Sequence, residues 1–172
     1  MAYYRRDWRG VLVSAGRLVR LGFGMSWGRT VRGAWLVLRA NQAWAPYPDN
    51  DPERARRLMR GFYALVVRDG GLTLDPERAA RLEVEWWRVH RARQRENALT
   101  EDDLLDSLVA LYAYVYGSDE IAVRPAAEHR TRAMRHSDDW HRDGCALDDP
   151  RLTQERAELV AAYTALLAAV RP

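Results

Sequence analysis

Lysine is absent from this chain of 172 residues: all 27 basic residues are arginine, and Ile121 is the only isoleucine. Because arginine, alanine, valine, glycine and aspartate have GC-rich codons, this usage is typical of a GC-rich bacterial genome. A functional interpretation is also open, since arginine binds phosphate, sulfate and carboxylate groups through paired hydrogen bonds. Composition alone does not separate the two.

Cysteine is nearly absent too, and long apolar runs are missing. The single Cys145 excludes an internal disulfide framework and fits a reducing compartment. The N-terminus never reaches an apolar stretch long enough for a signal peptide, and no uncharged run is long enough for a membrane span. We therefore expect a cytoplasmic protein with no membrane-spanning segment.

Negative charge is scarce at one end of the chain. Residues 1–44 hold eight arginines against Asp7 alone, a net charge of +7, and the whole chain carries +3, so the remaining residues carry −4. Such a basic arm can bind nucleic acid or anionic lipid, dock on an acidic partner, or lie on the protein's own acidic body. The last of these is the interpretation we favour.

Two octets of nearly the same sequence, residues 51–58 and 75–82, predict the starts of two helices. Each places aspartate at the N-cap, proline at the first helical position and glutamate in the first turn, where free amides and the positive dipole end favour these residues. Since the similarity fades after the leucine, a shared start signal is favoured over an internal repeat. We expect helices from Pro52 to Val67 and from Pro76 to Asn97.

Three more helices follow. Residues 100–117 are densely apolar and predict a helix buried on most of its circumference. A fourth helix starts at Ser118 or Pro125 and ends near Gly144, and Asp149-Pro150 opens the last. Its residues expected to face inward are Leu152, Leu159, Val160, Tyr163, Leu166, Leu167 and Val170. No segment shows the alternation and turn of a hairpin, so we expect an all-α, single-domain bundle of five to seven helices without significant sheet.

The first 44 residues are expected to form a basic, Trp/Arg-rich helical arm. Residues 8–19 and 27–38 keep helical spacing, and a glycine-rich joint separates them. The arm either packs on the helical body of residues 51–172 or docks beside it on a partner. If the arm packs on the body, the aliphatic parts of its arginine side chains would cover apolar core residues while the charged ends reach solvent. The residues expected to bind a partner are Trp8, Trp27, Arg29, Arg32 and Trp35.

The stretch from Glu83 to Arg91 is the first candidate site, because two tryptophans and a histidine lie where a plain bundle has aliphatic residues. A histidine at the margin of an aromatic patch is a candidate acid–base group. We expect Trp86 to belong to the core, with Trp87, Glu83 and His90 facing a pocket or a partner. The catalytic candidates are His90, Glu128 and His129, and the binding candidates are Trp86, Trp87, Glu83 and Arg88.

Each of these residues also has a purely structural interpretation. His90 can be hydrogen-bonded at the edge of the core, with the tryptophans as packing, and this alternative is favoured. For Glu128, the alternative is an ion-pair ladder with Arg124 and Arg132, four residues to either side.

Metal and nucleophile chemistry are poorly supported. Glu83 and His90 are seven positions apart, roughly 10 Å along a helix, which is too far to share one ion. Asp138 and His141 form one carboxylate–histidine pair, whereas di-metal bundles need two such pairs and two further carboxylates. Ser137 lies one turn before His141, but a serine inside a helix lacks a strained elbow and an oxyanion hole. We therefore expect no metal site and no cofactor.

In general character, through its lysine-free, Ala/Arg-rich helices, the chain resembles small helical proteins encoded in actinomycete biosynthetic clusters. Some of those are obligatory partners of a tailoring enzyme, and others are small catalysts. The resemblance implies an accessory subunit that binds a protein partner or a second copy of itself.

Two other functions stay open. One is a small helical enzyme or small-molecule binder with a pocket around Trp87, His90, Glu128 and His129. The other is binding of nucleic acid or an anionic surface through the basic arm. Nucleic acid ranks last because no recognised module is present and the body is acidic.

Overall fold

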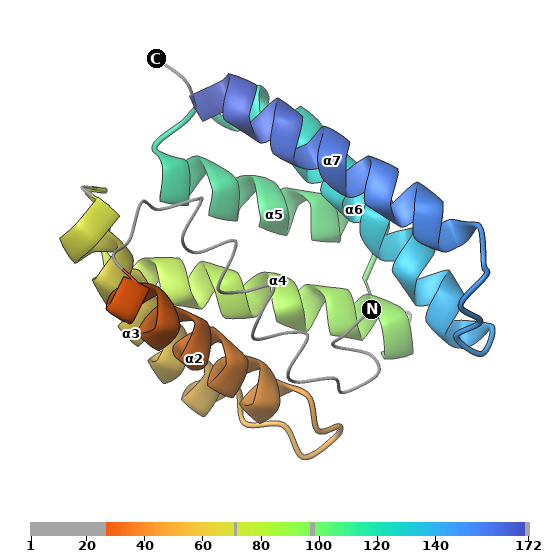
Figure 1. The fold of residues 1–172 in the computed structure, drawn as a ribbon, viewed down its shortest axis with the longest axis horizontal. Helices are drawn as coiled ribbons and strands as arrows, with labels where there is room; N and C mark the ends of the chain where they lie inside the picture. Colours follow the sequence, from red (N-terminus) through yellow and green to blue (C-terminus); the bar gives the residue numbers. More distant parts are fainter. Residues whose placement is uncertain (1–26, 71, 97–98, 171–172) are drawn as a thin grey trace. The chain divides into compact units, whose positions relative to one another are not determined.

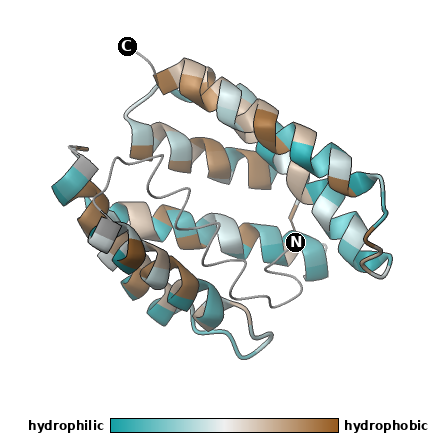
Figure 2. Cartoon of the chain, in the orientation of Figure 1, coloured by the Kyte–Doolittle hydropathy of each residue, from teal (hydrophilic) through white to brown (hydrophobic). Residues whose placement is uncertain are grey.

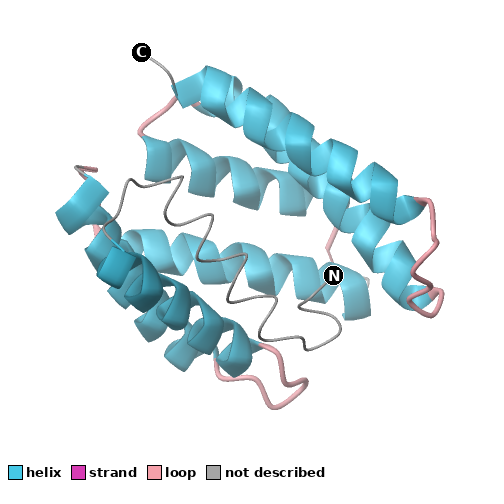
Figure 3. Ribbon diagram, in the orientation of Figure 1, coloured by secondary structure: helices cyan, strands magenta, loops and turns pink. Residues whose placement is uncertain are grey.

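The computed structural model describes residues 27–70, 72–96 and 99–170, and this part of the chain is helical without strands (Figures 1 and 3). The all-α fold expected from the sequence is confirmed. The described helices are α2 (Trp27–Trp44), α3 (Pro52–Gly70), α4 (Pro76–Glu96), α5 (Glu101–Tyr116), α6 (Glu120–Arg142) and α7 (Arg151–Val170). The helix predicted over residues 8–19 lies outside the described residues.

The chain divides into two compact units, residues 1–84 and residues 85–172, and the division falls inside α4. The single-domain organisation expected from the sequence stays a prediction. None of the described helices is long and apolar enough to cross a membrane.

In the first unit, α2 packs on α3. The side of α2 that carries Leu38 and Trp44 is buried, and so is the apolar face of α3. The hydroxyl of Tyr63 on α3 donates a hydrogen bond to Glu83 on α4, over 2.7 Å. The buried α3 residues are Ala55, Met59, Phe62, Tyr63, Leu65 and Val66.

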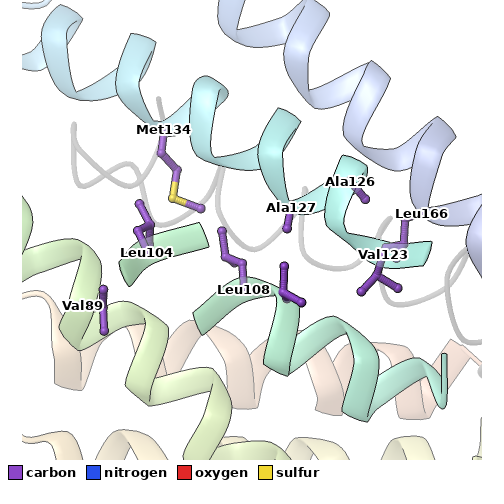
Figure 4. Packing of buried hydrophobic residues seen from close by; sticks show 9 residues of the cluster. Val89, Leu104, Leu108, Val123, Ala126, Ala127, Met134 and Leu166 are labelled. Atoms are coloured by element: carbon purple, nitrogen blue, oxygen red, sulfur yellow. The ribbon is translucent and has the colours of Figure 1, made fainter. Parts of the chain in front are cut away.

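In the second unit, four helices contribute side chains to one hydrophobic cluster (Figure 4). Three of its buried members come from α5, which is buried on most sides as predicted, and four come from α6. The buried members of the cluster are Val89, Leu104, Leu108, Val109, Val123, Ala126, Ala127, Met134 and Leu166. Figure 4 shows Val89 of α4 and Met134 of α6 to either side of Leu104.

Capping residues fix the helix ends in this unit. The Thr100 hydroxyl accepts a hydrogen bond from the Asp103 backbone amide, and the Asp103 carboxylate accepts one from the Thr100 amide, which forms a capping box at the start of α5. Gly117 ends α5 with a φ of 60°, a left-handed conformation that favours glycine. Asp119 caps α6, next to the predicted start at Ser118, and the alternative start at Pro125 is wrong because this proline lies inside the helix, beyond the first turn.

The predicted inward face of α7 is wrong in part. Leu166 and Ala162 are buried, whereas Val160, Tyr163 and Leu167, all expected to face inward, are exposed. The hydroxyl of Ser118 donates to the Ala169 carbonyl over 3.1 Å, and this bond ties the end of α7 to the start of α6.

Candidate functional site

Three polar side chains of α4 converge on one buried carboxylate of α6. His90, Arg93 and Gln94 are spaced i, i+3, i+4, so they share one helix face. The His90 Nε2 lies 3.0 Å from Oδ2 and 3.2 Å from Oδ1 of Asp138, and Arg93 Nη2 donates to Oδ2 over 2.6 Å. The Gln94 amide donates to Oδ1. We call these four residues the Asp138 cluster.

The cluster holds a charge that water barely reaches. The Asp138 side chain is 5% exposed, and a carboxylate buried without partners would be strongly destabilising. Here Arg93 balances its charge, and His90 and Gln94 supply further donors. The Arg93 Nε is buried without a hydrogen-bond partner, so its guanidinium is only partly satisfied. The cluster fastens α4 to α6 within the second unit.

The geometry also fixes how the His90 ring is used. Because Nε2 faces both carboxylate oxygens, Nε2 has to carry a proton, and in the neutral ring the lone pair is then on Nδ1. Among the described residues Nδ1 has no hydrogen-bond partner, and the side chain is 15% exposed. The Trp86 ring lies beside it, with centroids 6.3 Å apart. A carboxylate that orients a histidine with a free second nitrogen is the arrangement of a general base.

His129 belongs to a separate cluster that joins α6 to α7. Its Nδ1 lies 2.6 Å from Oε2 of Glu158, and Arg132 Nε donates to the same oxygen over 3.1 Å. Hydrogen bonding by His129, with a smaller contribution from Arg132, holds the pKa of Glu158 below its usual range. Glu128 has no hydrogen-bonding or ionic partner within the described residues. The expected ladder is not formed, because Arg124 pairs with Asp106 and Arg132 with Glu158.

The two histidines do not share a carboxylate. His129 and Asp138 are nine positions apart on α6, about 13.5 Å along the axis and half a turn around it. His90 therefore meets α6 at a different level and on a different face from His129. Within the described residues, no group of three or more His, Cys, Asp or Glu side chains is placed to hold a metal ion.

The aromatic pair reverses the expected order of exposure. Trp87, expected to face a pocket or a partner, is buried, whereas Trp86, expected in the core, is half-buried against the hydrophobic cluster. Their rings meet edge to face with centroids 6.2 Å apart. Arg88 pairs with Glu85 on the exposed surface over 2.7 Å, and this hydrogen bond lowers the pKa of Glu85.

On α2, the structure separates the predicted partner-binding residues. Arg29 pairs with the buried carboxylate of Asp69. Arg32 is exposed and makes no ion pair with any described residue, and Trp35 is 54% exposed. Trp8 and the side chain of Trp27 lie outside the described residues.

Two other candidate functional sites, the Ser137–His141 pair and a pocket in the first unit, are more weakly supported. Ser137 donates to Glu155 over 2.5 Å instead of pairing with His141. A pocket of about 380 Å³ in the first unit is lined by charges of both signs, and Arg60 and Glu77 are already paired over 3.3 Å. None of the predicted site residues lines this pocket.

Sequence reasoning missed the Asp138 cluster, although two signals were present. His90, Arg93 and Gln94 share one face of α4. Asp138 lies four positions after Met134 on the buried stripe of α6, where a carboxylate needs a polar partner.

Comparisons with known proteins supply no relative: the chain matches no protein-family model, no curated protein and no solved structure. Function therefore has to be inferred from the geometry of this chain.

Proposed function

We propose that this chain is an accessory subunit that binds a partner protein through the exposed side of α2. The α2 face consists of Val31, Arg32, Trp35 and Arg39. The observation that carries the proposal is the exposure of Trp35 beside the equally exposed Val31, while Leu38 on the same helix is buried.

The exposed Trp35 ring is held in position by a neighbouring side chain. The Arg39 guanidinium carbon lies 5.8 Å from the centre of the Trp35 ring, a cation–π contact, and Arg39 also donates to Gln42 over 3.1 Å. Tryptophan and arginine are the residue types most enriched at binding hot spots, where a large rigid side chain enters a dry pocket. An exposed tryptophan fixed from one side therefore fits an interface anchor.

The charges on this face specify the chemistry of the partner. Arg32 is exposed and free of ion pairs with described residues, and Arg39 flanks the ring one turn further on. A matching surface offers an apolar pocket for the indole with carboxylates at its rim. The separation of His90 from His129 further favours an interaction subunit over an enzyme with all candidate groups in one pocket.

The composition of the chain and its resemblance to biosynthetic-cluster proteins favour a bacterial, cytoplasmic setting and a tailoring enzyme as the partner. Affinity capture of the tagged chain from its native host, with mass spectrometry of what co-elutes, tests this assignment. Wild type and Trp35→Ala are compared with Ile121→Ala as the control. Ile121→Ala truncates a large exposed apolar residue of the other unit, away from the α2 face. A deletion of residues 1–44 is unsuitable, since α2 packs on α3.

We expect one partner to co-elute with wild type and Ile121→Ala and to be depleted at least about tenfold with Trp35→Ala, a loss of about 1.4 kcal/mol or more. Equal recovery with all three baits would rule out the α2 face.

A second function is favoured by one observation: the Asp138 carboxylate occupies one nitrogen of His90, and the other has no partner among the residues that the structure describes. We propose His90 as the base or acceptor of a small-molecule site whose wall includes Trp86. Ligand screening by NMR on the isotope-labelled full chain tests this, with His90→Gln as the control. A ligand that perturbs the His90 ring only in wild type supports it, and ligands that bind both proteins equally exclude it.

A further inference from the structure

The outer side of α7 forms a continuous uncharged strip. The α7 strip consists of Val160, Tyr163, Thr164 and Leu167, with Ala157 and Ala168 at its edges, and all six are exposed. Val160 is 62% and Leu167 54% exposed. At 100° per residue they lie opposite the buried Ala162 and Leu166. Figure 2 shows hydrophobic residues recurring along α7.

No charge interrupts this strip between Val160 and Leu167, and the exposed Arg156 lies one turn before it. After Glu158, no residue of α7 up to Val170 is charged. Exposed large apolar side chains gathered on one face indicate an interaction surface. The occupant of an uncharged strip has to be apolar and uncharged as well.

The spacing of the strip matches a second helix. The exposed Val160, Tyr163 and Leu167 follow at intervals of three and four residues, the repeat by which two helices pack side chains between one another, and the half-buried Val170 borders the strip. Elsewhere in the described residues, the exposed apolar pair of α2 covers a single turn, from Val31 to Trp35. Among the surfaces of the described residues, the one that best matches the length and apolar character of the α7 strip is therefore a second α7.

We propose that two copies of this chain form a symmetric dimer through their α7 strips, with the helices antiparallel. In a two-fold contact the same strip faces itself, so any charge on it would meet a like charge, and this strip has none. The antiparallel arrangement centres the seam on Ala165. It places Tyr163 of each copy against Leu167 of the other, and Val160 against Val170.

The parallel alternative is less well packed. It would stack Tyr163 on Tyr163 and Leu167 on Leu167, whereas the antiparallel seam alternates a large ring with a leucine. From Val160 to Val170 the seam is only about 15 Å long. One helix on each side covers less than the roughly 800 Å² per partner of a standard interface. A weak dimer with a micromolar dissociation constant is expected.

This inference goes beyond the proposed function, because it involves the second unit and no residue of the α2 face. The test is analytical ultracentrifugation of the full chain from about 1 µM to about 500 µM, a range that brackets micromolar dissociation constants. The variants are Tyr163→Glu, Leu167→Arg and the double variant of both. Ile121→Glu is the control, since it puts the same charge on a large exposed apolar residue outside α7.

We expect wild type and Ile121→Glu to dimerise with rising concentration. Each single variant leaves a charge unpaired in the seam and should raise the dissociation constant at least about 100-fold. The double variant places each new glutamate opposite a new arginine only if the helices are antiparallel, so it should regain most of the lost affinity. Circular dichroism checks that all variants keep their helices.

Three outcomes would overturn the proposal. Wild type could stay monomeric throughout the concentration range, or a dimer could survive both single variants unchanged. Failure of the double variant to recover, with both single variants impaired, would exclude the antiparallel register. Partner capture by the α2 face is unaffected by any of these results, so the two proposals fail independently.

Discussion

Asp138 and His90 are 48 positions apart in sequence, yet the carboxylate of one faces the imidazole Nε2 of the other at 3.0 Å. Arg93 completes an ion pair with the same carboxylate over 2.6 Å. Asp138→Ala would leave this arginine without its counter-ion in a nearly dry environment. We expect the free energy of unfolding in urea to fall by about 3 kcal/mol.

Asp139→Ala is the matched control for that experiment. Asp139 is the next residue along α6, but it pairs with Arg142 at the surface, and exposed pairs contribute little. A change of less than about 1 kcal/mol is expected there. Equal effects of the two substitutions would contradict a buried clamp at Asp138.

Replacing His90 by glutamine or by alanine should distinguish its hydrogen bond to Asp138 from the role of its second ring nitrogen. Glutamine can present an amide donor to Asp138 where Nε2 stood but has no equivalent of the free Nδ1. His90→Gln should therefore change the free energy of unfolding by less than about 1 kcal/mol, whereas His90→Ala should cost about 2 kcal/mol. Urea unfolding of both variants measures this, and equal losses would contradict the donor role.

The protonation pattern of His90 can be observed directly. We expect the ¹⁵N chemical shifts of the His90 ring to show a proton on Nε2, the nitrogen that faces Asp138. A proton on Nδ1 would mean that Nε2 does not donate to Asp138, and would remove the basis for a general base at this position.

The lowered pKa of Glu158 predicts that the free energy of unfolding depends on pH. Its pKa is lowered in the folded state by His129 and Arg132, so the group stabilises the fold above its unfolded pKa. That contribution is lost as the pH falls through the folded-state pKa. The difference in unfolding free energy between wild type and Glu158→Gln should be largest near neutral pH and shrink in acid. Parallel curves down to about pH 3, below the usual pKa of glutamate, would contradict the assignment.

Two residues of α2, three positions apart, should respond differently to truncation. Leu38 is buried, so Leu38→Ala should cost about 2–4 kcal/mol in unfolding free energy. Trp35 is mostly exposed, so Trp35→Ala should change stability by less than about 0.5 kcal/mol while it removes partner capture. A large loss of stability for Trp35→Ala would mark the indole as structural.

Helix starts could be predicted closely from the sequence because their signals are local. The starts of α3 and α4 follow from aspartate and proline at adjacent positions, and the start of α5 follows from the Thr100 cap. All of these groups act on backbone amides within one turn. For α6 the sequence offered two starts, Ser118 and Pro125, and the N-cap is Asp119, the residue next to Ser118.

The orientation of α7 was not predictable in the same way. Alanine, leucine and valine lie all round this helix after Glu158, so no polar stripe marks the side that faces water. The Asp138 cluster was missed for a different reason. Its members come from two helices, and the distance across that pair depends on packing that the sequence does not display.

The course of α4 through both compact units limits how this protein can be divided. Backbone hydrogen bonds of a helix link each amide to the carbonyl four positions earlier, so a break between Val84 and Glu85 would leave about four carbonyls before it and about four amides after it without partners. Neither half is therefore a natural fragment for expression, fusion or exchange between proteins.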